Sequence, residues 1–194
     1  MLLTPAPHAM TSSSQPSDWV RRWSGLIRPG ARVLDLACGS GRHFRWLAAQ
    51  GYVVTGVDRD EEALGPLASL GEVVCADLES GPWPLAGRRF DGVVVTNYLW
   101  RPLWTHILDA IDEGGCLLYE TFRAGHEQIG RPSRADFLLQ PGELWQVCGG
   151  LRVVAFEDGE LSGPRRRVQR ICALREPAAP AAGTWPLLFP AGDS

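Results

Sequence analysis

The chain has 194 residues, which is enough to bury a hydrophobic core as one domain without disulfide bonds or a structural metal. Hydrophobic residues make up 45% and charged residues 21%, a balance typical of a folded globular protein and not of a disordered one. The net charge of −3 supplies no global positive field that would draw the chain to nucleic acid or to an anionic membrane surface. No apolar run approaches the width of a bilayer, and we expect a cytoplasmic protein.

The two ends of the chain differ in composition from its middle. Residues 1–16 are rich in Ser, Thr and Pro, and residues 176–194 are rich in Pro and Ala. Neither stretch has enough apolar side chains to offset the entropy lost on ordering. We therefore predict a flexible N-terminal tail, a single domain over residues 17–175, and a flexible C-terminal tail.

The first half of this predicted domain alternates short strands with helices. The expected elements are a strand at 33–36, a helix at 41–50, a strand at 52–57, a helix at 61–70 and a strand at 73–76. Gly51 is a natural stop for the first helix. Gly65 and Pro66 weaken the second, because proline lacks the N–H that a helix interior needs.

The second half continues this alternation. The expected elements are a strand at 90–96, a helix from Pro102 that ends at Gly114 and Gly115, a strand at 116–122, a helix at 141–148, and strands at 151–156 and 167–174. The continuous run Val93–Val95 favours a strand that is covered on both faces. This pattern predicts an α/β fold in which a parallel sheet carries helices on both faces. Ligands of such sheets bind at the carboxyl ends of the strands.

A glycine-containing turn at Val33–Gly41 is the strongest local motif, because it lies where a strand passes into a helix. Glycines at 39 and 41 let the backbone approach a ligand closely, and N–H groups at the start of a helix are free to donate. The pattern alone also fits any tight turn. A dinucleotide-binding motif would need a third glycine where this chain has Phe44. The carboxylate of Asp35 would repel phosphates and attract a cationic ligand.

Two further acids directly follow predicted strands. Asp58 lies 19 residues past Gly39, a position from which a carboxylate can accept hydrogen bonds from both hydroxyls of a ribose. Asp58 could also cap a helix, but Asp60 can fill that position. Asp77 and the neighbouring backbone N–H could bind an adenine ring, although Asp77 considered alone fits a turn residue. Three successive strands that end in acids favour a shared ligand site.

These motifs, in this order and at this spacing, resemble those of the class I S-adenosylmethionine-dependent methyltransferases, over roughly residues 17–175. The segments similar to the family's four motifs are Val33–Gly41, Tyr52–Asp58, Cys75–Leu78 and Phe90–Asn97. The resemblance implies a Rossmann-like domain with a mostly parallel seven-stranded sheet, helices on both faces and an antiparallel last strand. It also implies S-adenosylmethionine as the cofactor.

The resemblance further implies individual residue roles. Asp35 and Gly39 would contact the methionine moiety of the cofactor, Asp58 its ribose, and Asp77 with Leu78 its adenine. Ala37 stands where many family members have glycine. The cofactor-binding residues predicted in this way are Asp35, Ala37, Gly39, Gly41, Asp58, Asp77, Leu78 and Asn97.

Within the class, shorter segments resemble the tellurite-resistance methyltransferases and related enzymes that act on small molecules. These segments are Cys38–Arg42, Leu47–Tyr52 and Phe137–Leu144. This second resemblance implies a small methyl acceptor without identifying it as tellurite.

The acceptor should enter beyond the fourth and fifth strands, because the donor would occupy the edge formed by the first three. Tyr98, Arg101 and Glu120 lie there and are the predicted catalytic residues, although Glu120 could instead balance a cation inside the fold. Residues 123–136 lack a helical or strand period and could form a lid over this region. We expect His43 to lie at the surface or to be partly packed, and His126 to face solvent.

These observations predict methyl transfer from S-adenosylmethionine to a small polar or anionic molecule. The alternatives are a binding module of the same fold that holds nucleosides without turnover, and an NAD-dependent oxidoreductase. The Arg165–Arg167 run is more typical of a solvated turn than of a nucleic-acid site. No group of His, Cys, Asp or Glu has the spacing of metal ligands, so we expect no metal.

Overall fold

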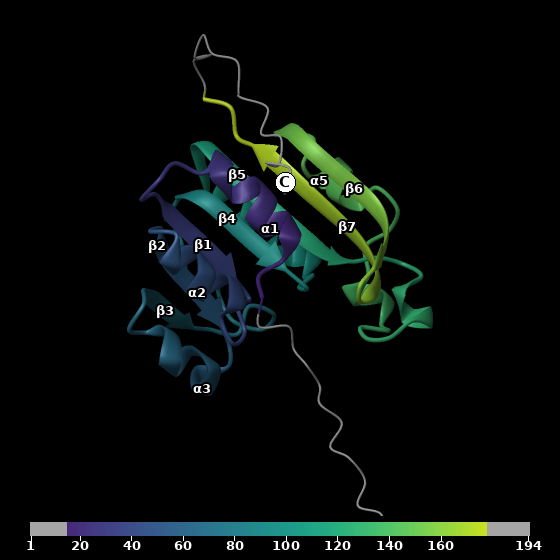
Figure 1. The fold of residues 1–194 in the computed structure, drawn as a ribbon, viewed down its shortest axis with the longest axis horizontal. Helices are drawn as coiled ribbons and strands as arrows, with labels where there is room; N and C mark the ends of the chain where they lie inside the picture. Colours follow the sequence, from purple (N-terminus) through teal and green to yellow (C-terminus); the bar gives the residue numbers. More distant parts are fainter. Residues whose placement is uncertain (1–14, 178–194) are drawn as a thin grey trace, which may run out of the picture.

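The computed structural model of the protein describes residues 15–177, so nearly all of the two predicted tails lies outside the described residues. A seven-stranded sheet crosses the molecule in the order β3-β2-β1-β4-β5-β7-β6 (Figure 1). The strands are β1 (Arg32–Leu36), β2 (Val53–Asp58), β3 (Glu72–Cys75), β4 (Phe90–Thr96), β5 (Ile111–Phe122), β6 (Arg152–Ser162) and β7 (Arg165–Leu174). The pairs from β3 through β5 are parallel, and β7 is antiparallel to both of its neighbours. The predicted α/β architecture and its antiparallel last strand are confirmed.

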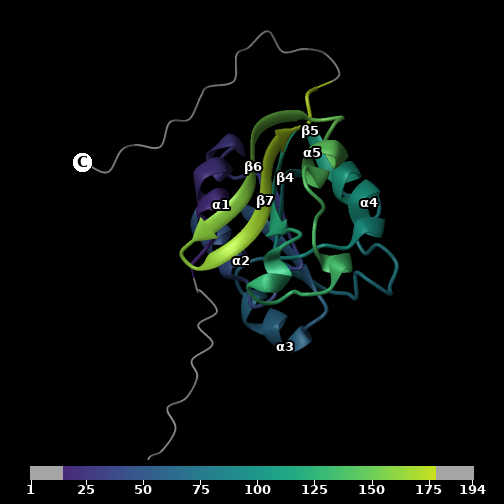
Figure 2. The same cartoon turned by 90° about the vertical axis from the view of Figure 1, so that its right-hand side faces the viewer.

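Helices cover both faces of this sheet (Figure 2). The α-helices are α1 (Asp18–Trp23), α2 (Arg42–Ala49), α3 (Glu61–Leu64), α4 (Trp104–Asp109) and α5 (Glu143–Val147). Short 3-10 helices lie at Ser24–Leu26, Gly65–Leu67, Arg101–Leu103, His126–Gln128 and Ala135–Phe137. Helices α1, α2 and α3 share one buried apolar cluster, whereas α4 and α5 share another on the opposite face.

The order in which successive strands are added to the sheet reverses at its centre. Strand β1 pairs with β2 on one side and with β4 on the other, so consecutive βα units are laid down in opposite directions from it. Val33, Leu34 and Leu36 of β1 are fully buried, as expected for a strand covered on both faces. The carboxyl ends of β1 and β4 therefore border the crevice where ligands bind in open α/β sheets.

Helix α1 is the element that sequence patterns did not predict, because its six residues are too few to show a helical period. Ser17 caps it, with its hydroxyl accepting from the Trp19 N–H at 3.1 Å. The buried Trp19 indole donates to the Ile171 carbonyl at 3.1 Å, which ties α1 to β7. The N-terminal helix is thereby held beside the C-terminal strand.

Two expectations about helix boundaries were wrong. The helix expected at 61–70 ends at Leu64 and continues as a 3-10 turn that contains Pro66. The helix expected to end at Gly114 and Gly115 stops at Asp109, and both glycines lie within β5, where the pairing with β4 is irregular.

The Arg165–Arg167 run belongs to β7 and is not a solvated turn. Arg165 is exposed, whereas Arg166 and Arg167 are both half-buried. Among the described helices, none is long and apolar enough to cross a membrane.

Candidate functional site

The turn between β1 and α2 forms a backbone cradle at the carboxyl edge of the sheet. Ala37, Gly39 and Gly41 have positive φ values of 53°, 53° and 77°. A Cβ on Gly39 would meet no atom within 4 Å, so this backbone is open to a ligand. A Cβ on Gly41 would lie 2.5 Å from the side chain of Leu67, so Gly41 serves close packing of the turn against the 3-10 helix Gly65–Leu67.

Asp58, at the end of β2, supports this cradle directly. Its Oδ2 accepts from the Gly39 N–H at 2.7 Å, and its Oδ1 accepts from the Asp60 N–H at 3.1 Å. Asp60 caps α3 through the Ala63 N–H, as expected, which leaves Asp58 at the edge of the site. The first glycine of the turn and the acid that ends β2 are therefore in direct contact.

Asp77 and Leu78 follow β3 and lie across from the glycine turn. Asp77 Oδ1 accepts from the Glu79 and Ser80 N–H groups at 2.9 and 3.3 Å, and these bonds lower the pKa of its carboxyl. Asp77 thus has the turn role that its own position in the sequence indicates. Its Oδ2 takes no part in these two hydrogen bonds and can accept from a ligand. Leu78 is buried and supplies an apolar surface.

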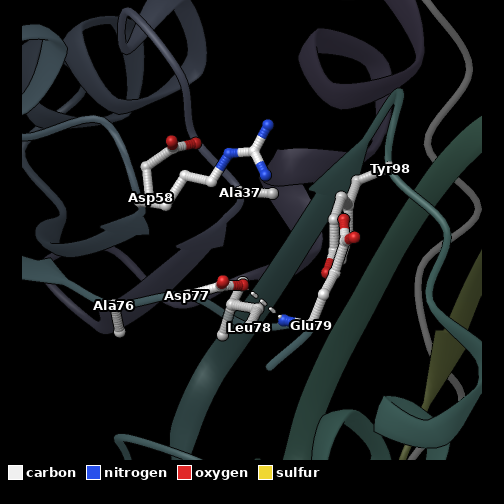
Figure 3. Close-up of a pocket in the computed structure, with 8 residues that line it drawn as sticks. Ala37, Asp58, Ala76, Asp77, Leu78, Glu79 and Tyr98 are labelled. Atoms are coloured by element: carbon white, nitrogen blue, oxygen red, sulfur yellow. Dashed lines mark hydrogen bonds between the residues drawn. The ribbon is translucent and has the colours of Figure 1, made fainter. Parts of the chain in front are cut away.

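These strand ends enclose a first cavity of about 160 Å³. Its lining residues are Ala37, Asp58, Arg59, Ala76, Asp77, Leu78, Glu79 and Tyr98. Figure 3 shows Tyr98 on the side opposite Asp58, with Asp77 and Leu78 below. The sequence predicts Tyr98 on the acceptor side, but the structure places it among the predicted donor residues. The Tyr98 hydroxyl is buried and has no hydrogen-bond partner within residues 15–177.

Asp35 lies beneath the turn and is 1% exposed. Burial raises the pKa of its carboxyl to about 7, although the Phe44 N–H and the charge of Arg42 act in the opposite direction. Among the described residues, its Oδ2 has no partner. A cation placed at this turn would stabilise the ionised form.

A second and larger cavity, about 600 Å³ in volume, meets the first at Ala37. Its walls come from the N-terminal segment, the glycine turn, the start of α2, the end of β4 and the β6–β7 hairpin. The lining residues are Gln15, Pro16, Ser17, Asp18, Ala37, Cys38, Gly39, Ser40, Arg42, His43, Thr96, Asn97, Gly163, Pro164 and Arg166. Asn97, a predicted donor residue, thus borders this second cavity, with φ 54°.

His43 fastens the N-terminal segment to this cavity. The ring Nε2 accepts from the Ser17 N–H at 3.0 Å, and Nδ1 lies 3.2 Å from the Thr96 hydroxyl. Burial, with the positive charge of Arg42 adding to its effect, lowers the pKa of His43 to about 3. His43 is therefore neutral near pH 7, and it is buried rather than partly packed.

Glu120, on β5, is 1% exposed behind the second cavity. Its Oε2 accepts from the Ser17 hydroxyl at 3.1 Å and from Arg170 Nη1 at 3.3 Å, and its Oε1 lies 3.7 Å from Arg166 Nη1. The structure therefore places Glu120 as an internal counter-charge. This is the alternative to a catalytic role that the sequence left open for it.

Arg101 does not reach either cavity. Its guanidinium forms a bidentate ion pair with Glu143, at 2.6 and 2.8 Å, and donates to the carbonyls of Asp136 and Leu138. Its donors are used in holding residues 136–143, which is a different role from the predicted contact with the acceptor.

The predicted lid over residues 123–136 is tied to the body of the domain. His126 is 3% exposed, and its Nδ1 accepts from the Arg167 N–H at 3.3 Å. Its Nε2 lies 3.1 Å from the Arg131 carbonyl. His126 therefore packs inside the segment. The expectation that it faces solvent was wrong.

Four residues at the second cavity were missed as functional candidates, namely Ser17, Arg42, His43 and Arg166. Arg42 was visible as the residue that follows the last glycine of the turn. Ser17 and Arg166 come from opposite ends of the domain, and no local pattern links them.

Comparisons with known proteins agree with this architecture. The family model described as "Methyltransferase domain" matches residues 33–114, from β1 into β5. TehB from Haemophilus influenzae has a TM-score of 0.67 at 21% identity, over 82% of this chain and 62% of that one. A TehB-like SAM-dependent methyltransferase from Corynebacterium glutamicum has a TM-score of 0.59 at 20% identity, over 81% of this chain and 87% of that one.

A sequence relative matches a shorter part of the chain. The ubiquinone biosynthesis O-methyltransferase of Aromatoleum aromaticum is 50% identical over 48 residues, which is 25% of this chain and 20% of that protein. The chain thus spans about a fifth of the length of the curated relatives that it matches. The family model matches the segment 33–114, and the similar solved structures show that the chain has the class I, Rossmann-like fold of methyltransferases.

Proposed function

We propose that the protein is an S-adenosylmethionine-dependent methyltransferase that acts on a small polar or anionic molecule, with residues 17–175 as its catalytic domain. The observation that carries the proposal is the hydrogen bond from the Gly39 N–H to Asp58, at the junction of the two cavities. It joins the open backbone of the turn to a strand-end acid, which is the arrangement that a nucleoside with a charged tail requires.

The first cavity fits the adenosine end of the donor. The carboxylate of Asp58 lines this cavity and can accept hydrogen bonds from the ribose hydroxyls. Leu78 and Ala76 provide apolar contact for a base. Tyr98 would cover the opposite face, and its partnerless hydroxyl could bond to a polar atom of the nucleoside. We therefore assign Tyr98 to the donor side.

The turn between the cavities fits the methionine end. Ala37 borders both cavities, the open Gly39 backbone lines the second, and the buried Asp35 Oδ2 beneath the same turn has no partner among the described residues. A buried carboxyl favours a cation, so the ammonium or sulfonium charge of the donor suits this position and phosphates do not. The same feature disfavours NAD.

When bound, S-adenosylmethionine supplies an activated methyl group for in-line displacement. The chain then has to position the acceptor, and positioning alone can contribute about 7–11 kcal/mol in favourable cases. His43 is unsuited to be a general base, because its Nε2 already accepts from Ser17. Burial raises the pKa of the Cys38 thiol above its usual value, so Cys38 is not a thiolate nucleophile.

The test is a comparison of ligands by thermal denaturation of the full chain. S-adenosylmethionine and S-adenosylhomocysteine should each raise the melting temperature, because a ligand that binds only the native state stabilises it by mass action. NAD at the same concentration should not. A larger shift with NAD would refute the proposal. S-adenosylhomocysteine release in a screen of small acceptors separates an enzyme from a binding module.

A further inference from the structure

Two arginines at the second cavity have donors that the rest of the described chain does not satisfy. Arg42 reaches the cavity from the start of α2, and Arg166 reaches it from β7. Arg42 Nη2 and Arg166 Nε are buried, and neither has a hydrogen-bond partner within residues 15–177. A buried charged donor without an acceptor is costly, so both atoms point to an acceptor supplied by a ligand.

The local charges leave an excess of positive charge at these arginines. Glu120 is the buried carboxylate nearest to Arg166, and it also pairs with Arg170. Arg170 has a second partner in Glu157, at 2.5 Å, so its charge is already balanced. Arg42 also lies in the field of Glu120, with Asp35 as its other anionic neighbour, so Arg42 and Arg166 share the charge of Glu120.

Asp58 near this cavity already accepts from the Gly39 and Asp60 N–H groups, and two further acids compensate little. Asp18 has a side chain that is 93% exposed, so solvent screens it, and it lies 3.7 Å from Arg21. Asp35 is partly protonated near neutral pH, since burial raises its pKa to about 7. An anion bound between Arg42 and Arg166 would complete the charge balance.

The size and lining of the cavity indicate what kind of anion fits. Its volume of about 600 Å³ exceeds the need of an inorganic ion, and Pro16, Ala37 and Pro164 provide apolar wall. Guanidinium groups bind carboxylates through paired N–H donors, which suits two arginines that approach from different elements. We infer that the second cavity binds the methyl acceptor through a carboxylate on a small organic molecule, held by Arg42 and Arg166. This inference rests on the proposed methyltransferase function.

The experiment uses the full chain saturated with S-adenosylhomocysteine and titrated by calorimetry. Benzoate is the probe, benzamide is its neutral match, and inorganic phosphate represents a free oxyanion. Benzoate should bind at least tenfold more tightly than either. Arg42→Gln and Arg166→Gln should each weaken benzoate binding about tenfold, and Arg42→Lys should restore part of the loss. Glu120→Gln should strengthen benzoate binding, because it removes the competing carboxylate.

Matched controls lie next to each arginine. Arg45 is exposed one turn along α2, and the Arg165 side chain is 61% exposed beside Arg166 on β7. Arg45→Gln and Arg165→Gln should leave benzoate affinity unchanged. In Arg42→Gln and Arg166→Gln, affinity for S-adenosylhomocysteine should stay within threefold of the unsubstituted chain.

The possible failures are distinguishable. Equal binding of benzoate and benzamide, or no binding of benzoate to the loaded chain, overturns the carboxylate site and leaves the methyltransferase proposal intact. Tighter binding of phosphate shows a site for a free oxyanion and overturns the organic acceptor. If Arg42→Gln and Arg166→Gln lose S-adenosylhomocysteine affinity as much as benzoate affinity, the arginines belong to the donor-binding site, and the inference is likewise overturned. If S-adenosylhomocysteine itself fails to bind, both proposals fall.

Discussion

At the scale of single residues, Asp58 combines two tasks that are usually considered separately. One oxygen holds the Gly39 N–H at 2.7 Å, and the carboxylate also borders the first cavity. The acid therefore shapes the turn before any ligand arrives. Losing it should affect both the geometry of the turn and the contact with a ribose.

Asp58→Ala should weaken binding of S-adenosylhomocysteine by tenfold or more, because each hydrogen bond to a charged group contributes about 1.5–3 kcal/mol. Calorimetry of the full chain measures this. Asp60→Ala is the control, since Asp60 caps α3 through Ala63. That variant should lose about 1 kcal/mol of unfolding free energy and keep its affinity for the ligand. If Asp58→Ala bound S-adenosylhomocysteine with unchanged affinity, Asp58 would only stabilise the turn and would not contact the ligand.

Asp35 makes stability depend on pH in a direction opposite to most carboxylates. Burial raises its pKa from 3.8 to about 7, so the folded chain binds this proton more tightly than the unfolded chain. The stability from this group is fully present below about pH 4 and is lost as pH rises through 7. The full change is on the order of 4 kcal/mol.

Asp35→Asn should therefore be more stable than the unsubstituted chain at pH 8, and the difference should shrink toward pH 5. Urea unfolding at several pH values gives both free energies. Asp18→Asn, at a side chain that is 93% exposed, should reproduce the unsubstituted profile. Parallel profiles for Asp35→Asn and the unsubstituted chain would contradict the raised pKa.

At the scale of elements, side chains hold the connection from β5 to α5 together with two short 3-10 helices and a parallel bridge between Arg123 and Leu139. Arg101 is its main anchor, through Glu143 and the carbonyls of Asp136 and Leu138. His126 anchors the other end against β7. The segment that appears structureless in sequence is thus fastened at two places.

Arg101→Ala should lower the free energy of unfolding by about 2 kcal/mol, because the ion pair is partly buried and Glu143 would lose its partner. Urea denaturation measures this change, and limited proteolysis should cut faster within residues 123–142. Arg134→Ala is the control, since Arg134 and Asp136 are 72% and 66% exposed and should contribute within about 0.5 kcal/mol. A loss of S-adenosylhomocysteine affinity in Arg101→Ala would contradict this purely structural role and would show that Arg101 supports ligand binding.

At the scale of the whole molecule, the two ends of the domain close on each other. Helix α1 packs through Trp19, which is 1% exposed, donates to Ile171 and lies under the Arg170 guanidinium at 5.0 Å. This contact carries Ser17 to the wall of the second cavity. The N-terminal segment is therefore part of the site and not an appendage.

Trp19→Ala should cost about 3–5 kcal/mol of unfolding free energy, which is the usual range for removing a large buried side chain. Urea denaturation with tryptophan fluorescence gives the value. Trp145 provides the control, because it is 52% exposed, and Trp145→Ala should cost less than about 1 kcal/mol. Equal costs for the two variants would argue against a fixed N-terminal helix.

The sequence by itself determined the sheet and most of the residues proposed for the donor. Asp58 ends β2 and Asp77 comes two residues after β3, and parallel strands bring their carboxyl ends to one edge of the sheet. The glycine turn is equally local, since the conformations of positions 39 and 41 depend on a few neighbouring residues. Chain order and local chemistry were sufficient for these assignments.

The tertiary structure alone decided which residues line the second cavity, where we propose that the acceptor binds. Ser17 and Glu120 are 103 residues apart in the chain, and Arg101 and Glu143 are 42 apart, so no periodic pattern links either pair. Which cation finds which carboxylate depends on how helices and hairpins pack across the sheet. That packing uses the donors of Arg101 inside the fold and leaves those of Arg42 and Arg166 at the cavity. The residue types were visible in sequence, but their partners were set by three-dimensional proximity.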